Sequence, residues 1–292
     1  MQSRALGDSG LSVSALAFGA MQLGAPQVSE TEAATMLNGA LDLGIRLIDS
    51  ARRYGLSEER IGRHLAGRRG EFLLSTKVGY DVPGHADWTH DCVVAGVDAA
   101  RARLRTDVID IVHLHSCPEN VLRERGVLEA LADCVSRGKV RLAAYSGDGA
   151  PLDYALDSGL VRSLQASVNL CDQAALATAQ RAASRGVGLL AKRAFLGHPW
   201  RSAAPPTDPP HRAYWERFQL LRRQIGEHDW PDLALRFAVH SSGISACIVG
   251  GTSLANLAQN VRTVERGAPG DDELAALRAV FAANAADWHG II

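Results

Sequence analysis

The chain has 292 residues, of which 47% are hydrophobic and 22% are charged, and its formal net charge is −1. This balance is typical of a globular protein, so it argues against a disordered chain and gives no support for a nucleic-acid-binding surface. No apolar run approaches the ~18 residues of a membrane helix, and the N-terminus lacks the basic start and long apolar core of a signal peptide.

Short apolar runs alternate with helical periodicity along nearly the whole chain. The runs predict eight buried strands, at residues 15–19, 45–49, 72–76, 108–114, 140–145, 163–168, 187–191 and 246–249. Apolar residues at helical spacing lie between them, for example Val93, Val97, Ala100 and Leu104. Ser29, with Glu32 three residues later, predicts a capping box at the start of the first helix, and Thr89 opens another.

Eight strand–helix units over about 250 residues are typical of a parallel barrel ringed by helices. We therefore predict the α/β class and one domain over residues 1–292, a (β/α)8 TIM barrel. The structural rival is a doubly wound open sheet, which often binds dinucleotides through G-x-G-x-x-G. That motif, a Walker lysine loop and a G-x-S-x-G elbow are all absent from the sequence.

One proline-rich segment follows the seventh predicted strand. Residues 198–213 hold five of the 11 prolines, together with His198, Trp200 and His211. Such a composition predicts an irregular loop rather than a helix or strand. Since substrate loops of barrel enzymes lie at this end of the barrel, we expect it to shape a substrate site. A tolerated surface insertion is the alternative.

Ionisable residues end three consecutive predicted strands. Asp49 follows the second, Lys77 the third and His115 the fourth, while Tyr54 stands five residues after Asp49. The carboxyl ends of barrel strands meet at one face, so these four side chains should share a pocket. Lysine is rare in this sequence, because only Lys77, Lys139 and Lys192 occur among 31 basic residues. A lysine at a strand end is therefore a candidate for chemistry.

The four side chains form a coherent acid–base set. An ammonium at Lys77 stabilises phenolate and so helps Tyr54 to release its proton. Asp49 would keep Lys77 charged and directed at Tyr54, and His115 would hydrogen-bond the reacting oxygen. Such a phenol can protonate a carbonyl oxygen while hydride arrives at the carbon. The plainer alternative is a buried Asp49–Lys77 ion pair beside a packed aromatic ring.

Other chemistries compete for the same residues. His113 and His115 form an H-x-H pair on one strand face, which could bind a metal; later strands supply no further histidines or aspartate, so we expect no metal. Lys77 alone could form a Schiff base. Five cysteines are odd in number, widely spaced and free of C-x-x-C pairs: Cys92, Cys117, Cys134, Cys171 and Cys247. This pattern favours a reducing cytoplasm over a disulfide scaffold.

These motifs resemble the aldo-keto reductase family over residues 4 to about 265. Residues 7–21 resemble its N-terminal β-hairpin and first strand, 49–62 its Asp-to-Tyr loop, 73–77 its lysine strand and 106–115 its histidine strand. The resemblance maps the family's catalytic tetrad onto Asp49, Tyr54, Lys77 and His115. It implies a barrel that binds a nicotinamide dinucleotide in extended form, NADP(H) more often than NAD(H), and reduces aldehydes or ketones.

The resemblance also implies cofactor-binding residues. Ser146 and Gln165, with Asp49, match the nicotinamide site, although Gly147 replaces the family's asparagine. Lys192 stands where many members carry a ring-stacking aromatic, and Lys192 or Arg193 would instead meet the pyrophosphate. Residues 250–260 resemble the adenosine-phosphate site, with Thr252, Ser253, Asn256, Gln259 and Asn260. Because Asn256 replaces an arginine or glutamine beside the 2′-phosphate, NADH use is more open than is usual in the family.

The sequence thus predicts an NAD(P)H-dependent oxidoreductase that reduces an aldehyde or ketone, or runs the reverse alcohol or sugar oxidation, with Tyr54 as general acid. We expect the substrate to meet Met21, Tyr54, Tyr80, Trp88, His115 and Trp200. These residues do not choose between a medium-sized carbonyl compound and a sugar. The partner is a small molecule, with no nucleic acid or membrane. The alternative function is a cofactor-binding sensor or scaffold with little turnover, as in potassium-channel β subunits.

Overall fold

The computed structural model describes residues 1–286, 288, 290 and 291, and within them eight parallel strands close into a barrel. The hydrogen-bonded order is β10-β3-β4-β5-β6-β7-β8-β9. The strands are β3 (Leu16–Gly19), β4 (Leu47–Asp49), β5 (Leu73–Val78), β6 (Ile109–His115), β7 (Val140–Ser146), β8 (Ser163–Ser167), β9 (Gly188–Lys192) and β10 (Ile244–Gly250). The predicted (β/α)8 barrel is confirmed, and each predicted strand corresponds to one barrel strand.

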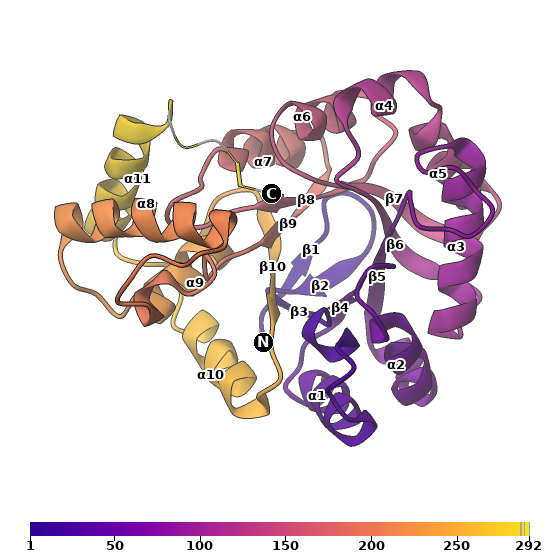
Figure 1. Ribbon diagram of the computed structural model, residues 1–292, viewed down its shortest axis with the longest axis horizontal. Helices are drawn as coiled ribbons and strands as arrows, with labels where there is room; N and C mark the ends of the chain where they lie inside the picture. The colour runs from indigo at the N-terminus through magenta and orange to yellow at the C-terminus, as the bar shows by residue number, and fades with distance from the viewer. Residues whose placement is uncertain (287, 289, 292) are drawn as a thin grey trace.

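Helices surround the strands, which lie in the middle of the view in Figure 1. They are α1 (Glu30–Asp42), α2 (Ser57–His64), α3 (His90–Leu104), α4 (Glu119–Glu124), α5 (Val127–Ser136), α6 (Ala150–Asp157), α7 (Ala175–Ser184), α8 (Pro209–Ile225), α9 (Trp230–His240), α10 (Leu254–Glu265) and α11 (Asp271–Asn284). Three 3-10 turns are η1 (Gln22–Gly24), η2 (Ala66–Glu71) and η3 (Pro199–Arg201). Ser29 caps α1 in the predicted capping box, and Thr89 caps α3. In the part of the chain described, no helix combines the length and apolar character that crossing a membrane requires.

An antiparallel hairpin closes the amino end of the barrel. It consists of β1 (Ser3–Ala5) and β2 (Ser12–Ser14), as the family resemblance implied. Its apolar side chains Leu6, Leu11 and Val13 pack against the side chains that fill the barrel interior. Gly7 has φ +54°, and a Cβ there would lie 2.2 Å from the carbonyl oxygen of Gly186, so only glycine allows this close approach. The plug leaves the carboxyl end as the open face.

The proline-rich segment is only partly irregular. Residues 209–213 belong to α8, so the prediction of a loop over all of 198–213 is wrong for its last five residues. Pro209 and Pro210 occupy the first helical turn, where a backbone N–H has no helical partner and its absence costs nothing. Asp208 caps the helix by accepting a hydrogen bond from the N–H of His211 at 3.3 Å.

The hairpin plug gives a stability prediction. Leu6 is 0% exposed in the apolar barrel interior, so Leu6→Ala should lower the free energy of unfolding by about 2–4 kcal/mol, because it removes buried contacts and leaves a cavity. Leu160 is 36% exposed, so Leu160→Ala is the matched control and should change it by less than about 0.5 kcal/mol. Urea denaturation measures both; equal effects would contradict the role of the plug.

Candidate active site

A cavity of about 590 Å³ opens at the carboxyl end of the barrel. Strand ends and the segments that follow them supply its lining, including all four residues of the predicted acid–base set: Asp49, Tyr54, Lys77 and His115. Residues far apart in sequence converge here because the parallel strands all end at this face.

Asp49 and Lys77 form a buried ion pair. Lys77 Nζ lies 2.5 Å from Asp49 Oδ2 and donates to the carbonyl oxygen of Ser50 at 2.8 Å. Ser75 Oγ donates to the other carboxylate oxygen at 2.7 Å. Burial by itself disfavours the ammonium, but Asp49, with a smaller effect of Tyr54, outweighs it and raises the pKa of Lys77 above its usual value. Lys77 is therefore a cation at neutral pH.

Tyr54 lies beside this pair on the loop between β4 and α2. Lys77 Nζ is 5.1 Å from the centre of the Tyr54 ring, and the His115 ring meets Tyr54 edge-on at 6.0 Å between centroids. Two glycines let the loop pack closely. A Cβ at Gly24 would stand 1.5 Å from the Tyr54 carbonyl oxygen, and Gly55 has φ +52°. The backbone N–H of Leu56 also donates to the Gly24 carbonyl at 3.0 Å.

His115 is uncharged in this setting. Burial, and after it the positive charge of Lys77, lower the pKa of His115 to about 3. Its Nδ1 lies 2.6 Å from the hydroxyl of Tyr80. A neutral imidazole can donate one hydrogen bond and accept another. His115 can therefore orient a polar oxygen without adding charge to the cavity.

A chain of hydrogen bonds links the ion pair to the neighbouring strands. Ser146 Oγ donates to Gln165 Oε1 at 2.8 Å, and Gln165 Nε2 donates to Asp49 Oδ1 at 3.2 Å. Both residues line the cavity. At Gly147, where the family resemblance expects asparagine, a Cβ would lie 2.4 Å from the Tyr145 hydroxyl. The position of Tyr145 therefore explains why this residue has no side chain.

Lys192 and Arg193 also line the cavity, at the end of β9. Lys192 Nζ pairs with Asp148 Oδ2 at 3.1 Å. Burial is the largest effect and lowers the pKa of Lys192, although Asp148 opposes it. Arg193 is exposed, and its φ of +61° is in the left-handed region. The cavity thus has the Lys77–Asp49 pair on one side and, across the barrel, two further basic side chains, of which Lys192 pairs with Asp148.

The residues predicted for an adenosine-phosphate site lie at the start of α10. Ser253 caps this helix by accepting from the N–H of Asn256 at 3.3 Å. Thr252, Asn256 and Gln259 are exposed, and Gln259 accepts from Arg262. Among described residues the cavity lining ends at Gly250, so these residues and Asn260 lie just beyond it.

The predicted substrate residues separate into two groups. Met21, Tyr54 and His115 line the cavity. Tyr80 and Trp88 pack against each other behind His115, with ring centroids 5.3 Å apart. The ring centroid of Trp200 lies 5.9 Å from that of Phe218 in α8. Trp200 is not among the described residues that line the cavity. His198, Pro210 and His211 line the cavity from the proline-rich segment, for which the sequence predicted a substrate-shaping role, and Tyr214 of α8, which was not predicted, lines it as well. Nothing in the local sequence pointed to Tyr214.

Backbone strain gathers around this face. Non-glycine residues with positive φ follow β5 (Asp81 and Trp88), β6 (Ser116) and β9, where they are Arg193, Leu196 and His198. Such conformations cost free energy and persist where the surrounding structure holds them, which is common at functional sites. His113, the first histidine of the H-x-H pair, is 0% exposed in the barrel interior. Among the described residues, no three His, Cys, Asp or Glu side chains are close enough to hold a metal ion.

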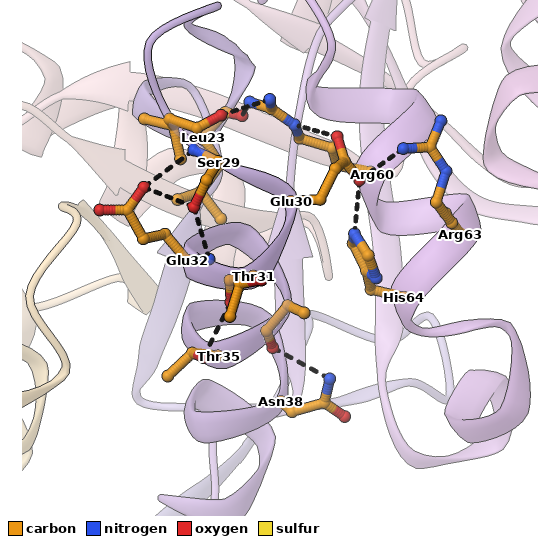
Figure 2. Close-up of polar contacts among 12 residues, drawn as sticks. Leu23, Ser29, Glu30, Thr31, Glu32, Thr35, Asn38, Arg60, Arg63 and His64 are labelled. Carbon is orange, nitrogen blue, oxygen red and sulfur yellow. Dashed lines mark hydrogen bonds and ion pairs between the residues drawn. The ribbon is translucent and has the colours of Figure 1, made fainter.

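A buried arginine fixes the loop that carries Met21 and Gln22 to the cavity. Arg60 of α2 donates to the carbonyl oxygens of Leu23, Ala25 and Val28, and to Glu30 at 2.9 Å. Figure 2 shows Glu30, at the start of α1, facing Arg60, Arg63 and His64 of α2. Hydrogen bonds from Arg60, and then from His64 and Arg63, lower the pKa of Glu30 to about 2.

Known proteins are similar to this chain in sequence and in fold. The model of the Aldo/keto reductase family matches residues 15–281. L-galactose dehydrogenase of Arabidopsis thaliana is 28% identical, with 90% of this chain and 88% of that protein covered. D-threo-aldose 1-dehydrogenase of a Pseudomonas species is 27% identical, covering 86% of this chain and 89% of the relative. An aldo-keto reductase structure from Bacillus halodurans, in its holo form, superposes with a TM-score of 0.83, at 25% identity and 96% coverage of both chains.

The role of Arg60 in fixing this loop can be tested against Arg63, which pairs with the same Glu30 carboxylate. Arg60→Met keeps the aliphatic length but leaves buried carbonyl oxygens and Glu30 without their donor, so the free energy of unfolding should fall by about 3–5 kcal/mol. Arg63 also pairs with Glu30, but 47% of its side chain is exposed. Arg63→Met should therefore cost less than about 1 kcal/mol. Equal losses in urea denaturation would contradict a special role for Arg60.

Proposed function

Since the chain belongs to the aldo/keto reductase family and is an oxidoreductase acting on carbonyl or alcohol groups, we propose that it works with a nicotinamide cofactor and uses Tyr54 as its general acid. The observation that carries this proposal is the convergence of Asp49, Tyr54, Lys77 and His115 on one cavity. A carboxylate, an ammonium, a phenol and a neutral imidazole at one strand-end face suit proton transfer to a carbonyl oxygen.

The residues around the cavity fit a nicotinamide. Ser146 and Gln165 offer a hydroxyl and an amide that can bind a carboxamide, and their mutual hydrogen bond fixes both side chains. Gly19 and Gly250 line the cavity without side chains, and a Cβ at Gly250 would lie only 2.4 Å from Gln22 Oε1. The cavity therefore has room for a flat ring beside polar partners. When bound, the nicotinamide exchanges a hydride with the carbon of the reacting group.

The four central side chains divide the remaining work. Tyr54 gives the proton of its hydroxyl to the carbonyl oxygen, so that one O–H bond breaks and another forms. Lys77 stabilises the remaining phenolate until it takes a proton from solvent, and Asp49 holds Lys77 in place. His115 donates a hydrogen bond to the same oxygen. Proton transfer from a positioned group contributes roughly 10²–10⁴-fold to the rate. For alcohol oxidation the same groups act in reverse.

The phosphates of the cofactor are assigned to the rim. Lys192 and Arg193 supply positive charge at the end of β9, and Thr252 and Ser253 lie at the N-terminus of α10, where free N–H groups favour anions. Asn256, Gln259 and Asn260 complete the adenosine side. NADP(H) is preferred to NAD(H) in this proposal, with a smaller margin than an arginine at position 256 would give.

The substrate is a small carbonyl compound or a sugar. Two relatives that match most of this chain are named as dehydrogenases of L-galactose and of D-threo-aldoses, which supports a sugar or its oxidised form. Met21 and Tyr54 are the proposed contacts on the cavity wall, together with His115. The five cysteines are unpaired and buried, which supports the proposed cytoplasmic location.

Tyr54→Phe tests the general acid directly. The variant keeps the ring beside Lys77 but removes the proton donor, so we expect kcat for carbonyl reduction to fall by roughly 10²–10⁴-fold. Cofactor affinity, measured by fluorescence titration with NADPH and NADH in parallel, should remain unchanged because the hydroxyl is not a proposed cofactor contact. The assay uses small aldehydes and aldoses as substrates.

Three results would count against parts of this proposal. Equal reduction rates for wild type and Tyr54→Phe would show that Tyr54 is not the acid. Failure of the folded wild-type protein to bind either dinucleotide would remove the nicotinamide assignment. Tight binding without measurable turnover in either protein would favour the alternative of a cofactor-binding sensor or scaffold.

A further inference from the structure

Tyr80 makes a close contact with His115 that the proposed reaction has not yet used. It stands three residues after Lys77, and its hydroxyl lies 2.6 Å from His115 Nδ1. The two rings are stacked, with centroids 5.5 Å apart and an interplanar angle of 25°. In the described chain His115 makes no other side-chain hydrogen bond, so Nε2 is left for the cavity that His115 lines.

The surroundings hold Tyr80 in this position. The Trp88 ring packs edge-on against Tyr80, and the backbone N–H of Trp88 donates to the Gly79 carbonyl at 2.7 Å. A Cβ at Gly79, where φ is +130°, would lie 2.2 Å from the Trp88 ring. Asp81 and Trp88 both have left-handed backbones, with φ of 59° and 60°. A strained segment thus keeps this phenol against the imidazole.

The neighbouring arginine favours one direction for the hydrogen bond between Tyr80 and His115. The Arg53 guanidinium lies over the Tyr80 ring, with Cζ 5.4 Å from its centroid. Burial raises the pKa of Tyr80 to about 12, against the opposing charge and hydrogen bonding of Arg53, so the phenol keeps its proton. A guanidinium has donors and no acceptor. Arg53 can therefore meet the Tyr80 oxygen only as a donor. This leaves the phenolic hydrogen free and takes up acceptor capacity of the oxygen, which favours donation from Tyr80 to His115 Nδ1.

The direction of this bond fixes the tautomer of the imidazole. A neutral imidazole carries one proton, so a ring that accepts at Nδ1 must carry it at Nε2. Nε2–H can then donate to a carbonyl oxygen in the cavity. In the opposite tautomer the lone pair of Nε2 would face the lone pairs of that oxygen, and the two atoms would repel each other. Tyr80, which does not line the cavity, thus controls whether His115 presents a donor or an acceptor to it.

We propose that Tyr80 is a positioning residue, which donates a hydrogen bond to His115 Nδ1, holds the Nε2–H tautomer and so makes His115 a donor to the carbonyl oxygen of the substrate. This inference rests on the proposed function for its kinetic consequence. The tautomer itself is a property of the protein alone and can be measured without turnover.

Nitrogen NMR of the full chain labelled with ¹⁵N-histidine provides the direct test. The His115 signals are assigned by their loss in His115→Gln. In wild type we expect a protonated Nε2 and an unprotonated Nδ1, with no change between pH 5 and 8, because the pKa of His115 is about 3. In Tyr80→Phe the two shifts should move toward each other as both tautomers become populated. A protonated Nδ1 in wild type would overturn the inference, even if Tyr80→Phe does not fold.

Kinetics supply the second readout. Tyr80→Phe should lower kcat about tenfold, as expected for the loss of one oriented hydrogen bond, while NADPH affinity stays unchanged. Tyr154→Phe is the matched control, since Tyr154 also lies under an arginine, with Arg123 Cζ 4.1 Å from its ring centroid, and does not line the cavity. It should leave both the His115 shifts and kcat unchanged.

The two proposals fail in different ways. Unchanged His115 shifts in folded Tyr80→Phe would refute the role of Tyr80, whereas the proposed function would stand as long as Tyr54→Phe abolishes reduction. A wild-type kcat in Tyr54→Phe would refute the role of Tyr54 as general acid. The ¹⁵N shifts of His115 would still show which tautomer is present.

Discussion

The buried ion pair between Asp49 and Lys77 is the interaction on which the open face of this barrel depends. Removing two charges from water is costly unless the remaining hydrogen-bonding positions are also satisfied. Here Ser75 and Gln165 donate to Asp49, and the Ser50 carbonyl accepts from Lys77. These partners come from β5, β8 and the end of β4, so the network joins the strands of the barrel and at the same time fixes the ammonium beside Tyr54.

The two ends of the barrel are formed by different kinds of side chain. At the amino end, the hairpin closes the interior with apolar side chains such as Leu6 and Leu11. At the carboxyl end, polar side chains, close glycine contacts and left-handed residues surround the cavity. Burial of the apolar side chains at the amino end stabilises the fold. This stabilisation offsets the free energy of the strained backbone conformations at the carboxyl end. Arg60 likewise stabilises the loop that precedes α1, where it donates to backbone carbonyl oxygens such as that of Ala25.

Burial disfavours the charged forms of Lys77, Lys192 and His115, but the resulting pKa depends on the neighbouring charges. Lys77 has Asp49 in direct contact and its pKa is raised, whereas the pKa of Lys192 is lowered although it pairs with Asp148. Burial, and after it the charge of Lys77, lower the pKa of His115 to about 3, against a smaller opposing effect of Asp49. The cavity therefore combines a charged ammonium with a neutral imidazole, and a neutral ring can have its donor atom selected by a neighbour such as Tyr80.

The eight strands, and the convergence of Asp49, Tyr54, Lys77 and His115 on one cavity, could be predicted without the structure. Buried strands have a strong apolar signal, and residues at the ends of parallel strands must meet, whatever their spacing along the chain. The place of Trp200 against Phe218, the entry of Tyr214 into the cavity lining and the contact of Tyr80 with His115 depend on the tertiary structure. Each of these depends on the direction of a side chain, which is set by packing against residues distant in sequence and is therefore not recorded in any local pattern.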